Sequence, residues 1–179
     1  MAEQGFRTKN SDGLLDFSTL SLQILERNVK SVLGNLHKNV YETSSPAKLV
    51  AVTKTVSSQV ICALGKLGIQ DIGENRVQVA LPKLLQIDEA ADFRLHWIGR
   101  LQTNKVKDII DKVFMLHSLD RLHLAQEVER RAAGAGRVLP ALVQVNIAGE
   151  SQKTGLSAAE VLPFLRQMKD FRNIRVKGL

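Results

Sequence analysis

The feature that most constrains the fold is a regular alternation of short apolar runs with amphipathic segments. The apolar runs have the length and composition of strands and cover residues 48–54, 69–73, 93–99, 112–119, 139–147 and 173–179. Segments with a helical spacing of apolar residues separate them, at 57–68, 74–87, 103–111, 120–134 and 157–170, and a further helix is predicted over 18–39. Strands that alternate with helices form parallel sheets covered by those helices, so the sequence predicts an α/β fold.

Two α/β architectures are compatible with this alternation. No glycine-rich phosphate loop follows the first strand, which disfavours a doubly wound nucleotide-binding sheet. The competitor is a (β/α)8 TIM-type barrel, which usually needs about 250 residues. The chain has 179 residues. We therefore expect a single domain over 1–179 that forms an incomplete barrel, about six of the eight strands, with its C-terminal part missing. Residues 1–16 are polar and are expected to form a loose arm.

The composition narrows the classes of partner and compartment. The formal net charge is +7, but the basic residues are scattered and aromatic residues make up only 4% of the chain, so we expect no nucleic-acid partner and favour an anionic small ligand. No apolar run approaches the roughly 20 residues of a membrane span, and no secretory signal is visible, so no membrane partner is expected. The single cysteine, Cys62, fits a reducing compartment, and we expect a cytoplasmic protein in which Cys62 is buried and inert.

Polar residues gather where the predicted strands end. Ligands of parallel α/β folds bind at the carboxyl ends of the strands. Lys54 ends the first strand, which is predicted to be buried, and Asn75 follows the second strand. His96 and Gly99 lie on the third strand, and His117 lies on the fourth. Their convergence predicts a ligand site at this end of the sheet.

Each of these residues also has a purely structural interpretation. Lys54 could pack its stem on apolar neighbours and extend its ammonium to water, or it could act as a nucleophilic amine toward a carbonyl, as lysines do with pyridoxal phosphate. Asn75 could cap a helix, His96 could be a hydrogen-bonded core histidine, and Gly99 could permit a close backbone approach or end a strand. No metal site is expected, because the histidines, the cysteine and the acids have no recognised ligand spacing.

The segments "LVAVTK", "IGENRVQ", "HWIGRLQTNK", "HSLD" and "VQVNIAGESQKTG" together resemble the pyridoxal phosphate homeostasis proteins, the YggS/PROSC-type family. The resemblance runs in unbroken order from about Leu22 to Leu179. It implies a barrel like the N-terminal domain of alanine racemase. In that family the chain continues through two more β-α units, which carry the groups that hold the cofactor's phosphate.

The resemblance also implies a cofactor and roles for individual residues. The cofactor is pyridoxal 5′-phosphate, and Lys54 matches the lysine that carries it as a Schiff base. Asn75 would lie beside the cofactor, and His96 and Gly99 would line the same cavity. The implied role is maintenance of vitamin B6 and amino-acid homeostasis without turnover, so no catalytic residue is expected and the protein is not expected to be an enzyme. Implied partners are the cofactor itself and pyridoxal-phosphate-dependent apo-enzymes as recipients, with the chain a monomer or weak dimer.

Three other functions are compatible with parts of the sequence. An amino-acid racemase or decarboxylase of the same barrel type would pair the lysine with a second acid or base, often a tyrosine from an added β domain. The only tyrosine here, Tyr41, precedes the first strand, which argues against racemisation. A nucleic-acid or general interaction module is supported by charge alone, and a non-functional fragment would unfold with poor cooperativity.

Overall fold

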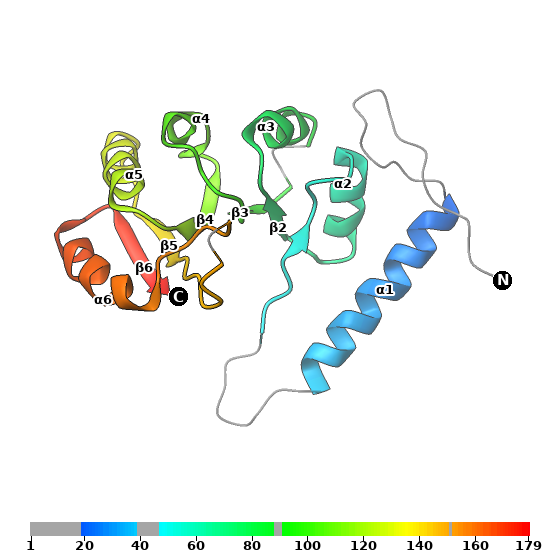
Figure 1. Cartoon of the computed structure of the whole chain (residues 1–179). Coiled ribbons are helices and arrows are strands. Elements are labelled where there is room, and N and C mark those ends of the chain that lie inside the picture. The colour runs from blue at the N-terminus through cyan, green and yellow to red at the C-terminus, as the bar shows by residue number, and fades with distance from the viewer. Residues whose placement is uncertain (1–18, 39–46, 88–90, 151) are drawn as a thin grey trace. The chain divides into compact units, whose positions relative to one another are not determined.

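The computed structural model describes residues 19–38, 47–87, 91–150 and 152–179, and in them strands and helices alternate in the predicted order (Figure 1). Tyr41 and the predicted arm over 1–16 lie outside the described residues. The chain divides into two compact units, one comprising Met1–Ile72 with Pro82–Phe93 and the other Gly73–Leu81 with Arg94–Leu179. Among the described helices, none combines the length and apolarity that crossing a bilayer requires.

The first unit contains α1 (Thr19–Lys38), β1 (Ala51–Val52) and α2 (Ser58–Lys66). Its core consists of buried side chains from α1, from α2 and from the segment after α2: Val29, Val60, Leu64 and Ile69. The partly buried Leu25 and Leu33 flank Val29 at helical spacing on α1, which explains why one face of this helix is apolar. The predicted buried strand over 48–54 is reduced to Ala51–Val52, and Val52 is 53% exposed, so the expectation of a buried first strand was wrong.

The remaining elements follow in chain order. They are β2 (Asp71–Glu74), α3 (Val77–Leu85), β3 (Arg94–Trp97), the 3-10 turn η1 (Thr103–Lys105), α4 (Val106–Ile109), β4 (Val113–Leu119), α5 (Leu122–Gly134), β5 (Leu139–Val143), α6 (Ala158–Gln167), the 3-10 turn η2 (Met168–Asp170) and β6 (Ile174–Gly178). Both β2 and α3 begin in one unit and end in the other.

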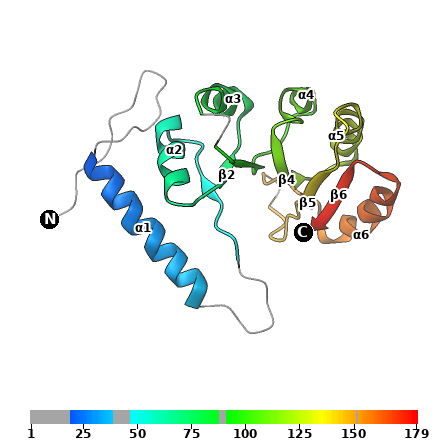
Figure 2. The ribbon, with the colours of Figure 1, turned by 180° about the vertical axis from the view of Figure 1, so that it is seen from behind.

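The strands form a six-stranded sheet in which hydrogen-bonded neighbours follow chain order from β1 to β6. In the second unit β3 pairs with β4, β4 with β5 and β5 with β6, all in parallel. Figures 1 and 2 show α4 and α5 along one side of β4 and β5, with α6 continuing around β6. This arrangement confirms the predicted α/β class with a parallel sheet.

The core of the second unit lies between these strands and helices. Leu116 and Ala141 form a paired position of β4 and β5, and both are fully buried. Leu124 and Val128 present the apolar stripe of α5 and are also fully buried. These buried side chains hold β4, β5 and α5 together, and so position the polar residues that follow β4 and β5.

Candidate functional site

Lys54 lies in a tight turn directly after β1, in the first unit. The Val56 N–H donates to the Thr53 carbonyl oxygen at 3.1 Å, which closes a β-turn with Lys54 and Thr55 at its centre. Thr53 is 1% exposed, whereas Lys54 is exposed. Ser57 then has the extended backbone of an N-cap residue, and α2 begins at the next position. The sequence thus places an accessible primary amine on a short turn between a strand and a helix.

Asn75 and Gly99 lie against each other in the second unit. A Cβ built on Gly99 would stand 2.5 Å from the Asn75 Cβ and 2.6 Å from its carbonyl oxygen, closer than any side chain tolerates. The Ile98 N–H donates to the Glu74 carbonyl oxygen at 2.9 Å, which fixes the neighbouring residues of the two segments. Gly99 therefore permits a close backbone approach, one of the two structural roles that its position suggested.

His96 and His117 form a pair between β3 and β4. The His96 Nδ1 and the His117 Nε2 lie 2.8 Å apart, so one of these nitrogens donates a hydrogen bond to the other. His96 is 5% exposed, and its ring also lies 5.4 Å from that of Phe114. Burial, and secondly the neighbouring His96, lower the pKa of His117 below its ordinary value of 6.5. The pair therefore joins β3 to β4 through a hydrogen bond between a buried and a half-buried side chain.

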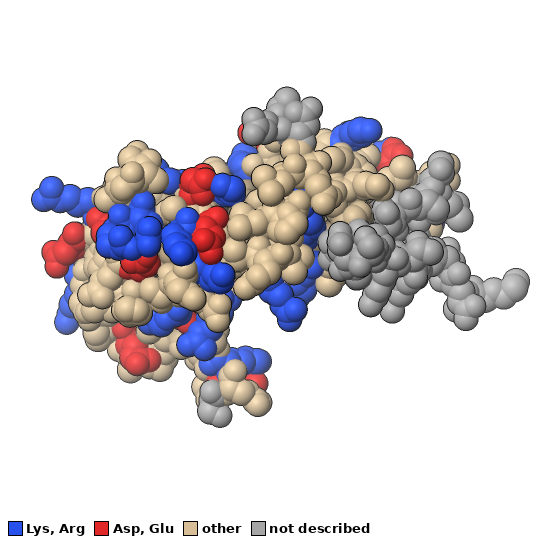
Figure 3. Space-filling model, turned by 90° about the horizontal axis from the view of Figure 1, so that it is seen from above, with Lys and Arg blue, Asp and Glu red and all other residues tan. Residues whose placement is uncertain are grey.

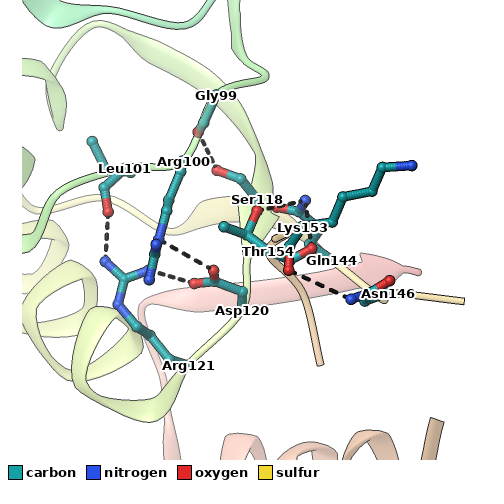
Figure 4. Close-up of polar contacts among 10 residues, drawn as sticks. All are labelled: Gly99, Arg100, Leu101, Ser118, Asp120, Arg121, Gln144, Asn146, Lys153 and Thr154. Carbon is teal, nitrogen blue, oxygen red and sulfur yellow. Dashed lines mark hydrogen bonds and ion pairs between the residues drawn. The ribbon is translucent and has the colours of Figure 1, made fainter. Parts of the chain in front are cut away.

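The residues after β3 are held by residues at the end of β4 (Figure 4). The Ser118 hydroxyl donates to the Gly99 carbonyl oxygen at 2.6 Å, and the Arg121 guanidinium donates to the Leu101 carbonyl oxygen at 2.6 Å. Arg121 also pairs with the buried Asp120, which lies 3.9 Å from the Arg100 Nε. The predicted site segments "HWIGRLQTNK" and "HSLD" are thus joined by the Ser118 hydrogen bond, and Arg121, the residue directly after "HSLD", adds a second one.

The loop after β5 is closed by two amide side chains, which Figure 4 also shows. The Gln144 side-chain amide donates to the carbonyl oxygen and the hydroxyl of Thr154, at 3.2 and 3.1 Å. The Asn146 amide donates to the carbonyl oxygens of Glu150 and Lys153, at 2.9 and 3.4 Å. These amides thus form hydrogen bonds within the loop itself. The Lys153 ammonium lies at the surface, 2.6 Å from a Glu150 carboxylate oxygen.

Basic and acidic side chains are interspersed over the surface in Figure 3. On α5, Glu127 pairs with both Arg130 and Arg131, with contacts of 2.6 and 2.7 Å. Hydrogen bonds from these two arginines lower the pKa of Glu127 to about 2. Much of the basic charge of this helix is therefore locally neutralised, which agrees with a scattered charge rather than a continuous basic stripe.

The four predicted site residues are divided between the two units. Asn75 and Gly99 are in contact, His96 lies one strand position before Trp97 on β3, and Lys54 belongs to the first unit. Cys62 is partly exposed, so its predicted burial was wrong: it lies beside the buried stripe of α2 rather than on it. Among the described residues, no group of three or more His, Cys, Asp or Glu side chains could hold a metal ion.

Sequence reasoning missed Lys83, a buried lysine on α3 that donates to the Thr53 carbonyl oxygen at 2.8 Å. The sequence does contain a signal for this residue, in the spacing of its apolar neighbours. Val77, Ala80 and Ile87 form the buried stripe around α3, and Lys83 falls in this stripe at helical spacing. A lysine on an apolar helical stripe needs a polar partner. One partner of Lys83 is the carbonyl oxygen of Thr53, the residue directly before Lys54 in the chain.

The known proteins that are similar to this chain include several pyridoxal phosphate homeostasis proteins. The chain is 40% identical over 133 residues to the pyridoxal phosphate homeostasis protein of Aquifex aeolicus, covering 74% of this chain and 58% of that protein. It is 32% identical over 146 residues to the pyridoxal phosphate homeostasis protein of Synechocystis, covering 81% of this chain and 67% of that protein. The chain thus spans less than two thirds of the Aquifex relative. No family model matches it.

Solved structures with a similar fold include PipY and alanine racemase. PipY of Synechococcus elongatus, in a structure with pyridoxal phosphate bound, is 27% identical with a TM-score of 0.71, over 82% of this chain and 66% of that one. Alanine racemase of Clostridium difficile is 15% identical with a TM-score of 0.64, over 85% of this chain and 39% of that one, and shows the fold alone. The predicted fold of the alanine racemase barrel type is confirmed.

Proposed function

The chain belongs to the family of pyridoxal phosphate homeostasis proteins, and from this premise we propose that it binds pyridoxal 5′-phosphate through Lys54 and helps to maintain vitamin B6 and amino-acid homeostasis. The observation that carries the proposal is the accessible Lys54 amine on the turn after β1, in a chain of this family. Bound pyridoxal phosphate supplies an aldehyde that reacts with amines.

The residues present fit such a group. An exposed primary amine held on a hydrogen-bonded turn is the group that an aldehyde requires, so Lys54 would hold the cofactor and the cofactor would supply the aldehyde for the bond. We propose that Asn75, His96 and Gly99 of the second unit also take part in binding the cofactor. There Asn75 brings an amide, His96 brings a buried imidazole, and Gly99 keeps its segment close to Asn75.

The first experiment is chemical labelling of the 179-residue chain. The chain is mixed with pyridoxal phosphate, reduced with borohydride and digested, and the modified lysines are identified by mass spectrometry. We expect labelling to be dominated by Lys54, and Lys54→Ala to remove it while the exposed-lysine control Lys66→Ala leaves it unchanged. Labelling scattered evenly over many lysines in the wild-type chain would contradict the proposal.

We also propose that the chemistry stops at cofactor binding, without turnover. The competing function is a racemase or decarboxylase of the same barrel type. The chain loaded with pyridoxal phosphate is incubated with L-alanine, and D-alanine is measured by chiral chromatography, with carbon dioxide release measured for a panel of amino acids. Product formed faster than by free pyridoxal phosphate at equal concentration would establish the enzymatic alternative.

The partners and the compartment follow from the same role. We propose that pyridoxal-phosphate-dependent apo-enzymes receive the cofactor, that the chain is a monomer or weak dimer, and that it works in the cytoplasm, where its single free cysteine would stay reduced. Transfer is tested by mixing the loaded chain with such an apo-enzyme and following its regained activity. Sedimentation velocity measures the oligomeric state.

A further inference from the structure

Lys83 is a buried cation in the first unit. It lies on α3 and is 3% exposed, and lysines are rarely so buried unless the ammonium has polar partners. Its Nζ donates to the Thr53 carbonyl oxygen at 2.8 Å, a hydrogen bond from a charged donor in a buried setting. The sequence separation of 30 residues means that α3 reaches back to the end of β1 through this side chain.

The Thr53 carbonyl is the group on which the turn around Lys54 depends. It accepts the Val56 N–H at 3.1 Å as well as the Lys83 ammonium, so both of its lone pairs are used. The same carbonyl lies in the rigid peptide plane that contains the Lys54 nitrogen and Cα. Fixing this oxygen therefore fixes the Lys54 nitrogen and Cα, and the hydrogen bond from the Val56 N–H limits the rotation about the N–Cα bond that directs the Lys54 side chain.

A second contact anchors the other end of the same segment. The Ser58 hydroxyl donates to the Gln86 side-chain oxygen at 2.7 Å, and Ser58 is the first residue of α2. Lys83 and Gln86 are three residues apart, so one short stretch of chain holds both ends of the segment 53–58. Of the two contacts, only that of Lys83 reaches the peptide plane next to Lys54.

We propose that Lys83 is a positioning residue for the Lys54 amine. Its hydrogen bond to the Thr53 carbonyl holds the turn in the conformation that presents Lys54 to an aldehyde ligand. The inference deepens the proposed function and rests on it. Lys83 itself makes no bond to the cofactor in this proposal.

The test compares the rate of pyridoxal phosphate attachment at Lys54 in matched variants. Lys83→Met keeps the apolar stem and removes the donor, Lys83→Arg keeps a charged donor, and Lys66→Met makes the same change at an exposed lysine of the same unit. Attachment is quenched with borohydride at successive times, and each labelled lysine is quantified by mass spectrometry. The ratio of labelling at Lys54 to labelling at Lys66 reports positioning of Lys54, because a general loss of stability does not favour either amine.

Lys83→Met is expected to slow attachment at Lys54 about tenfold, because a small misplacement of a reacting group has an effect of at least this order. It should leave labelling of Lys66 unchanged and accelerate hydrogen exchange at the Val56 amide. Lys83→Arg should recover part of the rate, and Lys66→Met should label Lys54 at the wild-type rate. If Lys83→Met does not fold by circular dichroism, Lys83→Leu, which also lacks a donor, is measured with the same expectation.

The outcomes separate the two proposals. Wild-type labelling dominated by Lys54 that Lys83→Met, or Lys83→Leu in its place, leaves unchanged would overturn the positioning role and keep the proposed function. A rate for Lys83→Arg no faster than that of the donor-free variant would also overturn it. Absence of preferred labelling at Lys54 in the wild-type chain would overturn the proposed function and this inference together.

Discussion

Gly99 shows how a missing side chain shapes the end of β3. A Cβ at this position would meet the Asn75 Cβ, carbonyl oxygen and Cα within 2.7 Å, and two of these atoms belong to the backbone, which cannot rotate away as a side chain does. Gly99→Ala is therefore expected to lower the free energy of unfolding by about 1–3 kcal/mol, the usual range for overpacking. Urea unfolding followed by the fluorescence of Trp97, the single tryptophan, measures this change.

The chain offers a matched control at the end of α5. Gly134 has no neighbouring atom within 4 Å of a built Cβ, and it is the last residue of the helix. Gly134→Ala should be neutral or stabilise the protein by up to about 1 kcal/mol, because alanine favours the helix and restricts the unfolded chain. Equal effects of the two substitutions would show that the close approach of Gly99 to Asn75 does not exist in solution.

The His96–His117 pair predicts a dependence of stability on pH. Because the pKa of His117 is lowered below 6.5 in the folded protein, the unfolded chain binds more protons at this residue when the pH falls through 6.5. The free energy of unfolding should therefore decrease as the pH drops from 6.5 toward the lower folded pKa. Denaturant titrations at several pH values should give a shallower decrease for His117→Gln, and an unchanged one for His123→Gln, a substitution at an exposed histidine of α5.

At the residue scale, the sequence predicted where the candidate residues lie along the strands, but not which side chains they contact. The strand ends predicted that Lys54, Asn75, His96 and Gly99 carry the site, and the structure places them after or on strands β1, β2 and β3. The His96–His117 contact was not predictable, because it depends on the register in which His96 of β3 lies opposite Met115 of β4. Lys83 was missed because a lysine on a helix is ordinarily solvated, and only the three-dimensional fold brings it to Thr53.

At the element scale, α5 carries a cluster of ion pairs whose contribution to the free energy of unfolding should depend on pH. Arg130 and Arg131 lower the pKa of Glu127 to about 2 from an ordinary value of 4.5, so its stabilising contribution is complete above pH 4.5 and is lost as the pH falls toward 2. Because Arg130 is 60% exposed, we expect Glu127→Gln to cost less than about 1 kcal/mol at neutral pH. The difference in free energy of unfolding between wild type and variant should shrink between pH 4.5 and 2, and a constant difference would contradict the ion pairing.

The elements themselves were largely predictable, because hydrophobic periodicity follows directly from the geometry of strands and helices. The predicted strand over 112–119 corresponds to β4 at Val113–Leu119, and the helix over 120–134 to α5 at Leu122–Gly134. The first strand was overestimated. Its apolar residues Leu49 and Ala51 are only partly buried and pack on the cluster of α1 and α2, so an apolar run was compatible with a short strand flanked by irregular chain.

At the scale of the whole molecule, the net charge of +7 predicts only weak and unspecific binding to polyanions. Acidic partners lie beside many of the basic side chains of the described surface, among them Glu127 beside Arg130 and Glu150 beside Lys153, so the excess charge is dispersed. Binding of this kind releases condensed counterions and therefore weakens steeply with salt. We expect the anisotropy of a fluorescent DNA duplex to rise with the chain at low salt and to lose this response at physiological salt.

The same experiment distinguishes charge from the proposed site. In the proposed function, pyridoxal phosphate is held by a covalent bond to Lys54 and does not depend on the dispersed surface charge. An excess of duplex at physiological salt should then leave Lys54 labelling by pyridoxal phosphate unchanged. Duplex binding that persists at physiological salt and blocks Lys54 labelling would favour a nucleic-acid module, because one surface would then serve both ligands. Persistent labelling beside lost duplex binding would assign the positive charge to general attraction of anions and the specificity to the turn that carries Lys54.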